Sequence, residues 1–295
     1  MKLLTTIHNL ENVSLLMPHV DGFIVGVKGF STRETSYLEM DELTLLNQQL
    51  NENNKELYLS FKPFLHNQGE DLKKFLASLK LNIKGIIIGD ISYFYLLKDL
   101  NIPLIYNPET LITNTFDMNI FFKTGLKGVF LSKEINLEDI KEMAKNKEGN
   151  IFMVGHGHLN MFYSKRSLLT SYFKEINKEF TYKGKTLLIK EEKRSENLPI
   201  IEDDFGTHVY RSKISTVIDY LEDLANVDYL LVDSLFYDDE YSKDILKMFS
   251  NKKTKEEIIN KYNQEWDNGF LTTKTIYKRN ENDWTISSSW GFRKT

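Results

Sequence analysis

Short apolar runs recur along the chain, and the first seven are each followed by a segment with helical spacing of apolar residues. Strands that are apolar throughout and alternate with helices are typical of a parallel sheet whose two faces are both buried. Eight such runs within about 230 residues fit a (β/α)8 barrel of the TIM-barrel type, and a doubly wound open sheet stays the alternative. The runs span residues 2–7, 23–27, 57–61, 85–89, 103–106, 128–131, 151–154 and 229–232.

One connection, from Val154 to Tyr229, is much longer than the others. It holds a predicted helix and then FTYKGKTLLI (180–189) and LPIIEDDFGTHVYRS (198–212), which indicate short strands with turns at Gly184 and Gly206. We therefore expect a small β insertion at about 178–212, between strands seven and eight of a barrel domain over 1–250. Residues 251–295 are expected to add a helix and a terminal hairpin, the latter from TTKTIYKRNENDWTISSSW, packed on the barrel.

The composition is that of an ordinary globular protein, with 41% hydrophobic and 27% charged residues and a net charge of -4. A chain of this charge needs a local basic patch if it is to bind nucleic acid. The chain has no cysteine, which excludes disulfides, a thiolate nucleophile and a cysteine-ligated iron–sulfur cluster. Neither a signal-peptide pattern nor a run of membrane-spanning length is present, so we expect a cytoplasmic protein.

Polar residues follow almost every predicted strand, at the end of the barrel where such folds carry function. Any one of them is also typical of a helix cap or a turn. Asp90 is predicted to cap a helix that begins at Ile91, and Asn136 to cap the next helix but one. Glu134 stays open between a functional and a structural interpretation. The strand-end residues are His8, Asn9, Lys28, His66, Asn67, Asp90, Asn107, Glu109, Lys133, Glu134, His156, His158, Asp233 and Ser234.

The stretch GHGHLNMFYSKRSLLTSYF (155–173) carries the most specific pattern. Ser164 is a good N-cap for the helix that follows, which would place Lys165 and Arg166 at its first two positions. Cations there oppose the helix dipole at a cost of about 0.3–1 kcal/mol each. Either the cost is tolerated, or the two cations complement an anion held at the helix N-terminus, with glycines that let it approach the backbone. A metal site is not favoured, because the two histidines lack a third clustered ligand.

The same stretch resembles the signature of peptidase family U-32, the collagenase-like family. Further matches follow in order along the chain, and the short, cysteine-poor branch of the family fits best: IIIGD (86–90), NPETLITN (107–114), LSKEINLEDI (131–140), PIIEDDFGTHVYRS (199–212) and DNGFLTTKTIY (267–277). The resemblance implies a barrel fold and a part in 5-hydroxylation of wobble uridine in tRNA. It also implies prephenate as a possible co-substrate, tRNA as a partner, and a possible paralogue of the same family as a second subunit.

The residues and the resemblance together define a candidate site. His156 and Glu134 are the predicted catalytic residues that handle protons. Prephenate is a dicarboxylate, which suits the anion site predicted at Lys165 and Arg166. The predicted substrate-binding residues are Asn107, Glu109, Asn114, Tyr163, Ser164, Lys165, Arg166, His208 and Asp233.

Three functions stay open at this point. The first is a tRNA-modification protein, which would be favoured by a basic face near the barrel mouth, formed by Lys165, Arg166, Lys174, Lys183, Lys185, Lys190, Lys193 and Arg194. The second is a collagenase-like peptidase, which needs a nucleophile or a metal-activated water. The third is a non-catalytic partner of a cluster-bearing paralogue, which would be marked by a large apolar surface patch.

Overall fold

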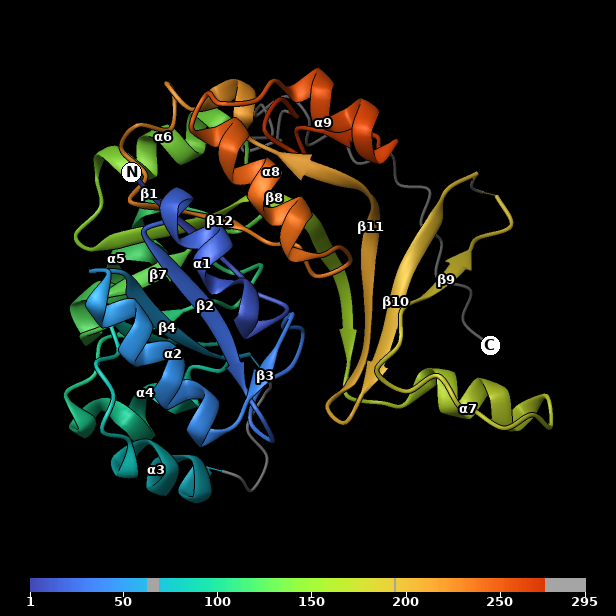
Figure 1. Ribbon diagram of the computed structural model, residues 1–295, viewed down its shortest axis with the longest axis horizontal. Helices are drawn as coiled ribbons and strands as arrows, with labels where there is room; N and C mark the ends of the chain where they lie inside the picture. Colours follow the sequence, from blue (N-terminus) through green and yellow to red (C-terminus); the bar gives the residue numbers. More distant parts are fainter. Residues whose placement is uncertain (63–68, 194, 274–295) are drawn as a thin grey trace, which may run out of the picture.

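Eight parallel strands close into a barrel in the computed structural model, which describes residues 1–62, 69–193 and 195–273 (Figure 1). Each strand pairs with its neighbour, and the last strand pairs with both the first and the seventh, so the eight barrel strands close on themselves. The predicted (β/α)8 fold is confirmed, and the open sheet is excluded. The barrel strands are β1 (Lys2–Thr5), β2 (Gly22–Val27), β4 (Glu56–Phe61), β5 (Gly85–Ile88), β6 (Leu104–Tyr106), β7 (Gly128–Phe130), β8 (Asn150–Ser164) and β12 (Tyr229–Val232).

Helices cover the outside of the barrel (Figure 1). The Asn136 side chain accepts a hydrogen bond from the Asp139 N–H at 3.0 Å, so this predicted cap is confirmed. Asp90 accepts from the Ser92 N–H at 2.9 Å, and the helix there begins at Ser92, one residue later than predicted. The barrel helices are α1 (Val13–Leu16), α2 (Met40–Glu52), α3 (Gly69–Ser78), α4 (Ser92–Leu97), α5 (Thr115–Thr124), α6 (Leu137–Lys145) and α8 (Asp239–Phe249).

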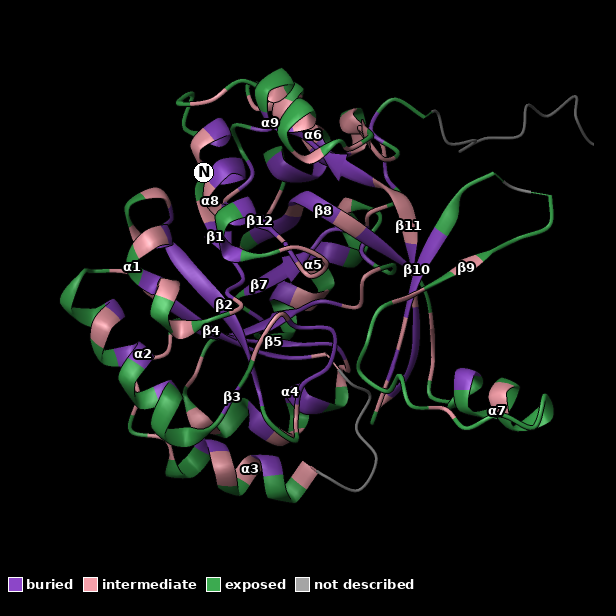
Figure 2. Ribbon diagram, turned by 45° about the vertical axis from the view of Figure 1, so that its right-hand side comes forward, coloured by how far each residue is buried: buried purple, intermediate pink, exposed green. Residues whose placement is uncertain are grey.

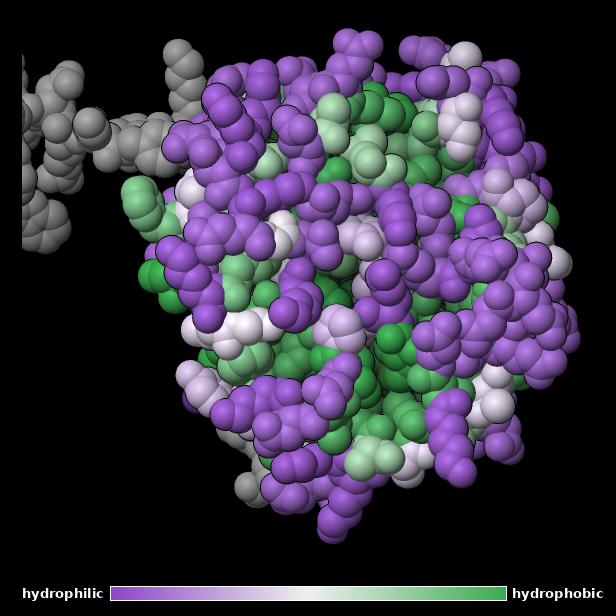
Figure 3. All heavy atoms as spheres, turned by 90° about the vertical axis from the view of Figure 1, so that its left-hand side faces the viewer, coloured by the Kyte–Doolittle hydropathy of each residue, from purple (hydrophilic) through white to green (hydrophobic). Residues whose placement is uncertain are grey.

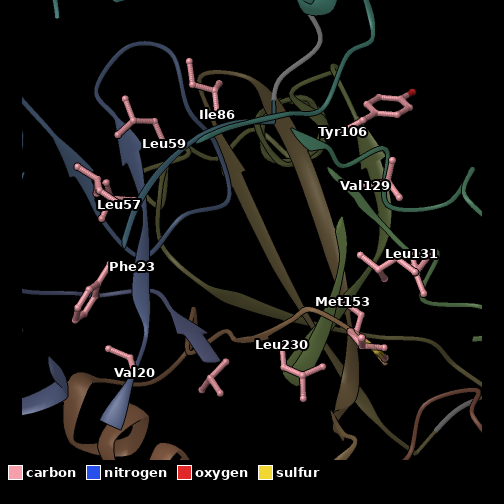
Figure 4. Packing of buried hydrophobic residues seen from close by; sticks show 14 of the residues in the cluster. Val20, Phe23, Leu57, Leu59, Ile86, Tyr106, Val129, Leu131, Met153 and Leu230 are labelled. Carbon is pink, nitrogen blue, oxygen red and sulfur yellow. The ribbon is translucent and has the colours of Figure 1, made fainter. Parts of the chain in front are cut away.

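The barrel strands separate two apolar cores, which is why their sequences are apolar throughout. The outer core lies between strands and helices, where Figure 4 shows Phe23, Leu57 and Val129 among its members. The inner core fills the barrel, and in it the rings of Phe152 and Tyr229 stack with centroids 4.2 Å apart. The strands are accordingly buried along most of their length (Figure 2). The interior is packed, so a ligand has to bind at an end of the barrel.

The insertion starts earlier than predicted, because β8 does not end at Val154 but continues to Ser164. Its second half pairs antiparallel with β11 (Gly206–Thr216), which pairs with β10 (Asn197–Asp203), which in turn pairs with β9 (Leu187–Lys190). Between β8 and β9 lies α7 (Leu168–Glu175). We call residues 165–205 the arm, and they project from the barrel (Figure 1).

The last described segment returns to the barrel. It forms α9 (Lys255–Tyr262) and β13 (Trp266–Asp267), which pairs with β11. Another short strand, β3 (Tyr37–Leu38), pairs with β2. The predicted terminal hairpin lies, from residue 274 on, outside the described residues. None of the described helices is long and apolar enough to cross a membrane.

Candidate functional site

Six charged residues gather at the carboxyl end of the barrel, and we call them the mouth cluster: Arg33, Glu34, Lys62, Glu109, Lys133 and Asp233. Arg33 and Glu34 share the loop after β2. The other four follow β4, β6, β7 and β12, in the order given. The carboxyl ends of parallel strands meet at one end of a barrel, which brings together residues up to about 200 positions apart in the chain.

Ion pairs connect most of the mouth cluster. The Arg33 guanidinium Nη1 lies 2.8 Å from Glu109 Oε2, and Lys133 Nζ lies 3.9 Å from the same oxygen. Lys62 Nζ lies 3.0 Å from Glu34 Oε1, which also accepts a hydrogen bond from Ser60 Oγ at 2.7 Å. The side chain of Glu34 is only 1% exposed and that of Arg33 only 6%. Charges this deeply buried are stable only when paired, so the network holds the mouth in one geometry.

The environment shifts the carboxyl pKa values in opposite directions. Burial alone would raise the pKa of Glu109, but Arg33, Lys133 and Lys62 outweigh burial and lower it. Burial raises the pKa of Glu34 and of Asp233, although Lys62 opposes the rise in both. Burial also lowers the pKa of Lys133. Glu109 is thus held ionised, whereas Glu34 and Asp233 take up a proton more readily. Carboxyl groups whose pKa values are separated in this way are suited to acid–base catalysis.

Aromatic residues from the base of the arm cover this cluster. The Arg33 guanidinium lies 5.1 Å from the centroid of the Tyr163 ring, which stacks on the His208 ring at 4.9 Å. His208 Nε2 lies 3.3 Å from Asp203 Oδ1. Burial lowers the pKa of His208 although Asp203 opposes the shift, so the imidazole is neutral near pH 7. The predicted residues Tyr163 and His208 therefore lie close to the predicted residue Glu109, to which Arg33 connects them.

A cavity of about 1110 Å³ opens between the loop after β2 and the arm. We call it the arm cleft; Arg33, Glu34, His208 and Tyr210 are among the residues that line it. Four buried polar atoms of these side chains have no hydrogen-bond partner among the described residues: Arg33 Nε, Glu34 Oε2, His208 Nδ1 and the Tyr210 hydroxyl. Unpartnered buried polar atoms are rare in folded proteins. The residues that carry these four line one cavity next to the mouth cluster, which makes the arm cleft a candidate ligand site.

Three other predicted residues lie outside the mouth cluster. Asn107 accepts a hydrogen bond from the Glu109 N–H at 3.2 Å, so it shapes the loop that carries Glu109. Asn114 is the N-cap of α5 and accepts from the Asp117 N–H at 2.9 Å. Glu134 is exposed and lines a separate cavity of about 410 Å³, with Lys133 and Arg211. Asn114 and Glu134 are thus not brought to the arm cleft.

The predicted anion site at a helix N-terminus is wrong. Ser164 is the last residue of β8, opposite Thr207 of β11, and α7 begins only at Leu168. Strand pairing therefore continues to Ser164, and Lys165 and Arg166 lie exposed in the connection before the helix. The first three N–H groups of α7 are already bonded within the protein: Leu168 N donates to Thr207 Oγ1 at 3.0 Å, and the Glu202 carboxylate accepts from Leu169 N at 2.7 Å and from Thr170 N at 3.2 Å.

The two histidines of the signature stretch face the α8 side of β8. His156 is fully buried, and its Nε2 is 2.6 Å from the Tyr241 hydroxyl of α8. Burial lowers the pKa of His156 to about 3, which keeps it neutral. His158 Nδ1 lies 2.8 Å from the Arg211 carbonyl oxygen. A Cβ on Gly157 would meet the Asp233 carbonyl oxygen at 2.7 Å, so this glycine admits a neighbouring strand end instead of the predicted anion.

Sequence reasoning missed Arg33, Glu34, Lys62 and Tyr210. Lys62 directly follows a buried strand, and the rule that selected Lys133 a few residues after β7 would have found it. Arg33 and Glu34 lie further along the loop after β2, where only the fold shows that they turn inward. Of the other strand-end residues, His66 and Asn67 lie outside the described residues. Among the residues that are described, no three His, Asp or Glu side chains come together as possible metal ligands.

A closed parallel barrel with a polar cluster at the carboxyl ends of its strands defines the class of TIM-barrel proteins, whose sites lie at that end. Within this class the chain belongs to peptidase family U32, whose model matches residues 9–284. The resemblance stated from the sequence is thereby confirmed.

Two relatives extend the comparison. The chain is 26% identical over 304 residues to tRNA hydroxylation protein P2 of Bacillus subtilis (strain 168), covering 93% of this chain and 98% of that protein. Among solved structures, that of the U32 peptidase Mk0906 superposes with a TM-score of 0.51 at 10% identity. The match covers 79% of this chain and 92% of that one, and it supports the shared fold.

Proposed function

We propose that this protein acts in tRNA modification, contributing to the 5-hydroxylation of wobble uridine with prephenate as the source of the hydroxyl group. The observation that carries the proposal is the similarity to tRNA hydroxylation protein P2, which extends over nearly the full length of both chains. A match of this extent takes in nearly the whole fold, so it is not the likeness of one shared module.

The charge of the arm supports RNA as the partner. Residues 165–201 of the arm contain nine Lys and Arg against five Glu, whereas its last residues add Glu202, Asp203 and Asp204, and the whole chain carries a net charge of -4. The predicted basic face thus falls on one projecting segment beside the barrel mouth, and its described members are all exposed (Figure 2): Lys165, Arg166, Lys174, Lys183, Lys185, Lys190 and Lys193. Arg194 lies outside the described residues. Such a segment attracts the phosphates of RNA even when the rest of the protein repels them.

Exposed aromatic side chains accompany these cations. Tyr172 and Tyr182 are both exposed, and the rings of Phe173 and Phe180 lie 5.3 Å apart between them. Aromatic side chains beside basic ones are the combination that binds single-stranded or looped RNA, because unpaired bases stack on the rings. An anticodon loop offers both unpaired bases and phosphates, so it suits the arm better than a regular duplex does.

The proposed contacts of the co-substrate lie at the base of the arm. Prephenate is a dicarboxylate, and the exposed side chains of Lys165 and Arg166 are its proposed contacts. The absence of cysteine from the chain rules out a cysteine-ligated cluster, so any redox step needs either cluster-free chemistry or a second subunit. Proton handling is proposed for Glu109, Asp233 and Glu34, in place of His156 and Glu134.

The second-subunit alternative has an observation of its own. Phe116 and Ile120 lie one turn apart on α5, and Phe116 is 84% exposed, with the exposed Leu111 in the loop before the helix. Figure 3 shows the side of the molecule away from the arm, where polar side chains surround an apolar area. A paralogue could cover such apolar residues, in which case this chain would be active only in the complex.

For the peptidase alternative, the described residues contain one serine–histidine pair, His8 and Ser234, with Nε2 and Oγ 3.2 Å apart. Ser234 is fully buried, and His8 Nε2 also lies 3.0 Å from the Ser234 carbonyl oxygen, which accepts the ring proton. A histidine that donates this proton cannot take one from the serine, so the pair does not have the arrangement of an activated nucleophile.

The test is mass spectrometry of tRNA nucleosides from a strain that lacks the gene. We expect 5-hydroxyuridine and its derivatives to disappear and to return on complementation. An arm variant with Lys174, Lys185 and Lys190 all changed to Ala should restore them poorly. A charge-matched control with Lys74, Lys80 and Lys98 changed to Ala should restore them fully. An unchanged nucleoside profile in a strain without a redundant paralogue would overturn the proposal, and gelatin cleavage by the pure protein would then favour the peptidase.

A further inference from the structure

A second cavity, separate from the arm cleft, contains an amine with the surroundings of a nucleophile. We propose that Lys133 is the reactive group of this cavity and forms an imine with a small aldehyde or ketone. The inference goes beyond the proposed function and does not depend on it. It gives a chemical role to the member of the mouth cluster that lines this cavity.

The second cavity has a volume of about 410 Å³ and lies beside β11. Arg211 of β11 lines it, whereas the preceding residue, Tyr210, lines the arm cleft, so the two cavities lie on opposite faces of the strand. Apolar side chains, Leu159, Leu198 and Phe270 among them, form part of its wall. Pockets of this size with largely apolar walls commonly hold small molecules. The cavity can therefore hold a small organic compound beside Lys133.

The other two cations of the second cavity are paired with carboxylates. Arg211 Nη1 and Nη2 lie 3.0 Å and 2.5 Å from the two oxygens of Asp267, and the guanidinium lies 5.5 Å from the centroid of the Phe270 ring. Lys213 Nζ lies 3.3 Å from Glu265 Oε2. Both cations are thus held in ion pairs, which keep them protonated and their carboxylate partners ionised.

Lys133 differs from these cations in its surroundings. Within the described part of the chain its Nζ has one carboxylate oxygen near it, Glu109 Oε2 at 3.9 Å, and Arg33 already binds that oxygen at 2.8 Å. The side chain is 13% exposed, so it is largely desolvated and yet not sealed from solvent. Burial lowers the pKa of Lys133, and the attraction of Glu109 does not offset this effect.

Lys62, the other lysine of the mouth cluster, shows that burial alone does not produce such an amine. Its side chain is 10% exposed, but Glu34 Oε1 lies 3.0 Å from its Nζ. Burial would lower the pKa of Lys62, and the attraction of Glu34 and Asp233 outweighs burial and raises it. Lys62 is therefore held protonated, whereas Lys133 is the lysine of the cluster that gives up its proton more readily.

A lysine that is neutral for part of the time is a nucleophile toward carbonyl groups. The lone pair of its nitrogen forms a bond to the carbonyl carbon. The carbonyl oxygen takes up the two amine protons and leaves as water, so that a C=N bond replaces the C=O bond. The step needs no oxidant, reductant or cofactor, and water reverses it.

The test is reductive trapping of the full-length protein near pH 7. The protein is incubated separately with pyruvate and with propanal in the presence of sodium cyanoborohydride, which reduces an imine to a stable amine. Peptide mass spectrometry then locates the labelled lysines over time. We expect Lys133 to be labelled well before Lys62 and Lys213. The rapid label should be lost in Lys133→Arg, which keeps the positive charge, and retained in the matched control Lys213→Arg, which changes another lysine of the same cavity.

The two probes separate the possible carbonyl compounds. Rapid labelling by pyruvate alone would assign the cavity to keto acids, and rapid labelling by propanal would show that no carboxylate is needed. If Lys133 is labelled no faster than Lys213, or if Lys133→Arg keeps the rapid label, the proposal is wrong. It is also wrong if the preference for Lys133 persists in protein unfolded by guanidinium chloride, since the cause would then be the local sequence. None of these outcomes bears on the proposed function, which the analysis of tRNA nucleosides tests separately.

Discussion

The contact between Glu202 and the N-terminus of α7 gives the sharpest prediction. Glu202 of β10 is 1% exposed, and its carboxylate accepts hydrogen bonds from the N–H groups of Leu169 and Thr170 and from the Thr170 hydroxyl. Together with Thr207 Oγ1, which accepts from Leu168 N at 3.0 Å, Glu202 anchors the beginning of the helix to the neighbouring strands. Glu202→Ala removes all of these bonds and leaves two backbone donors of the first turn without a partner.

The magnitude follows from the number and type of these bonds. Hydrogen bonds to a charged acceptor contribute about 1.5–3 kcal/mol each, and two backbone donors are involved. Part of this is recovered when water reaches the freed N–H groups, so we expect the free energy of opening α7 to fall by about 3 kcal/mol. That corresponds to roughly 100-fold faster amide exchange, since each 1.4 kcal/mol is a factor of ten. The barrel itself should keep its stability, because α7 lies outside it.

Hydrogen–deuterium exchange read by mass spectrometry measures this directly in peptides that cover Leu168–Glu175. Glu192→Ala, which removes an exposed carboxylate elsewhere on the arm, is the control and should leave exchange unchanged. If exchange in α7 is the same in Glu202→Ala as in the wild type, then Glu202 does not hold the helix. The assignment of the α7 N-terminus to an internal carboxylate would then be refuted.

Two further predictions concern buried charges. Lys62→Ala leaves Glu34 buried without its cation and should lower the free energy of unfolding in urea by about 3 kcal/mol, whereas the double variant with Glu34→Gln should recover part of the loss. The second prediction concerns Asp244. Burial alone would raise the pKa of this carboxyl, but hydrogen bonds from Lys253, Lys261 and Tyr262 outweigh burial and lower it to about 2. A carboxyl whose folded pKa is depressed stabilises the protein above its unfolded pKa near 3.9, and this contribution of about 2 kcal/mol is lost as pH falls from about 4 to 2. The stability gap between the wild type and Asp244→Asn in urea should therefore shrink over that range, and a gap that is constant with pH would contradict the argument.

The chain shows clearly which local features a sequence reveals. The eight apolar runs were all barrel strands, because a strand buried on both faces must be apolar at every position, and that requirement is visible within a few residues. The Asn136 cap was also readable, because the capping oxygen and the N–H that it satisfies lie three residues apart. The family signature likewise depends on a contiguous stretch of the chain.

The candidate site was only partly readable. Glu109 and Asp233, which belong to the mouth cluster, were selected. Tyr163 and His208, whose stacked rings lie next to Arg33 of that cluster, were selected too. Arg33 was not selected, since its pairing with Glu109 joins residues 76 positions apart and nothing in either local sequence records it. The N-terminus of α7 was misassigned for the same reason: its anion, Glu202, comes from a strand more than 30 residues away.

The sequence by itself determined the barrel, its helices and the family, because burial and capping act over a few neighbouring residues and leave a pattern in them. The tertiary structure decided which charges meet, which donors are already satisfied and which polar atoms remain free to bind a ligand. Those outcomes depend on contacts between loops and strands that are far apart in the chain. Such contacts form only when the barrel closes and β8 extends past it into the arm.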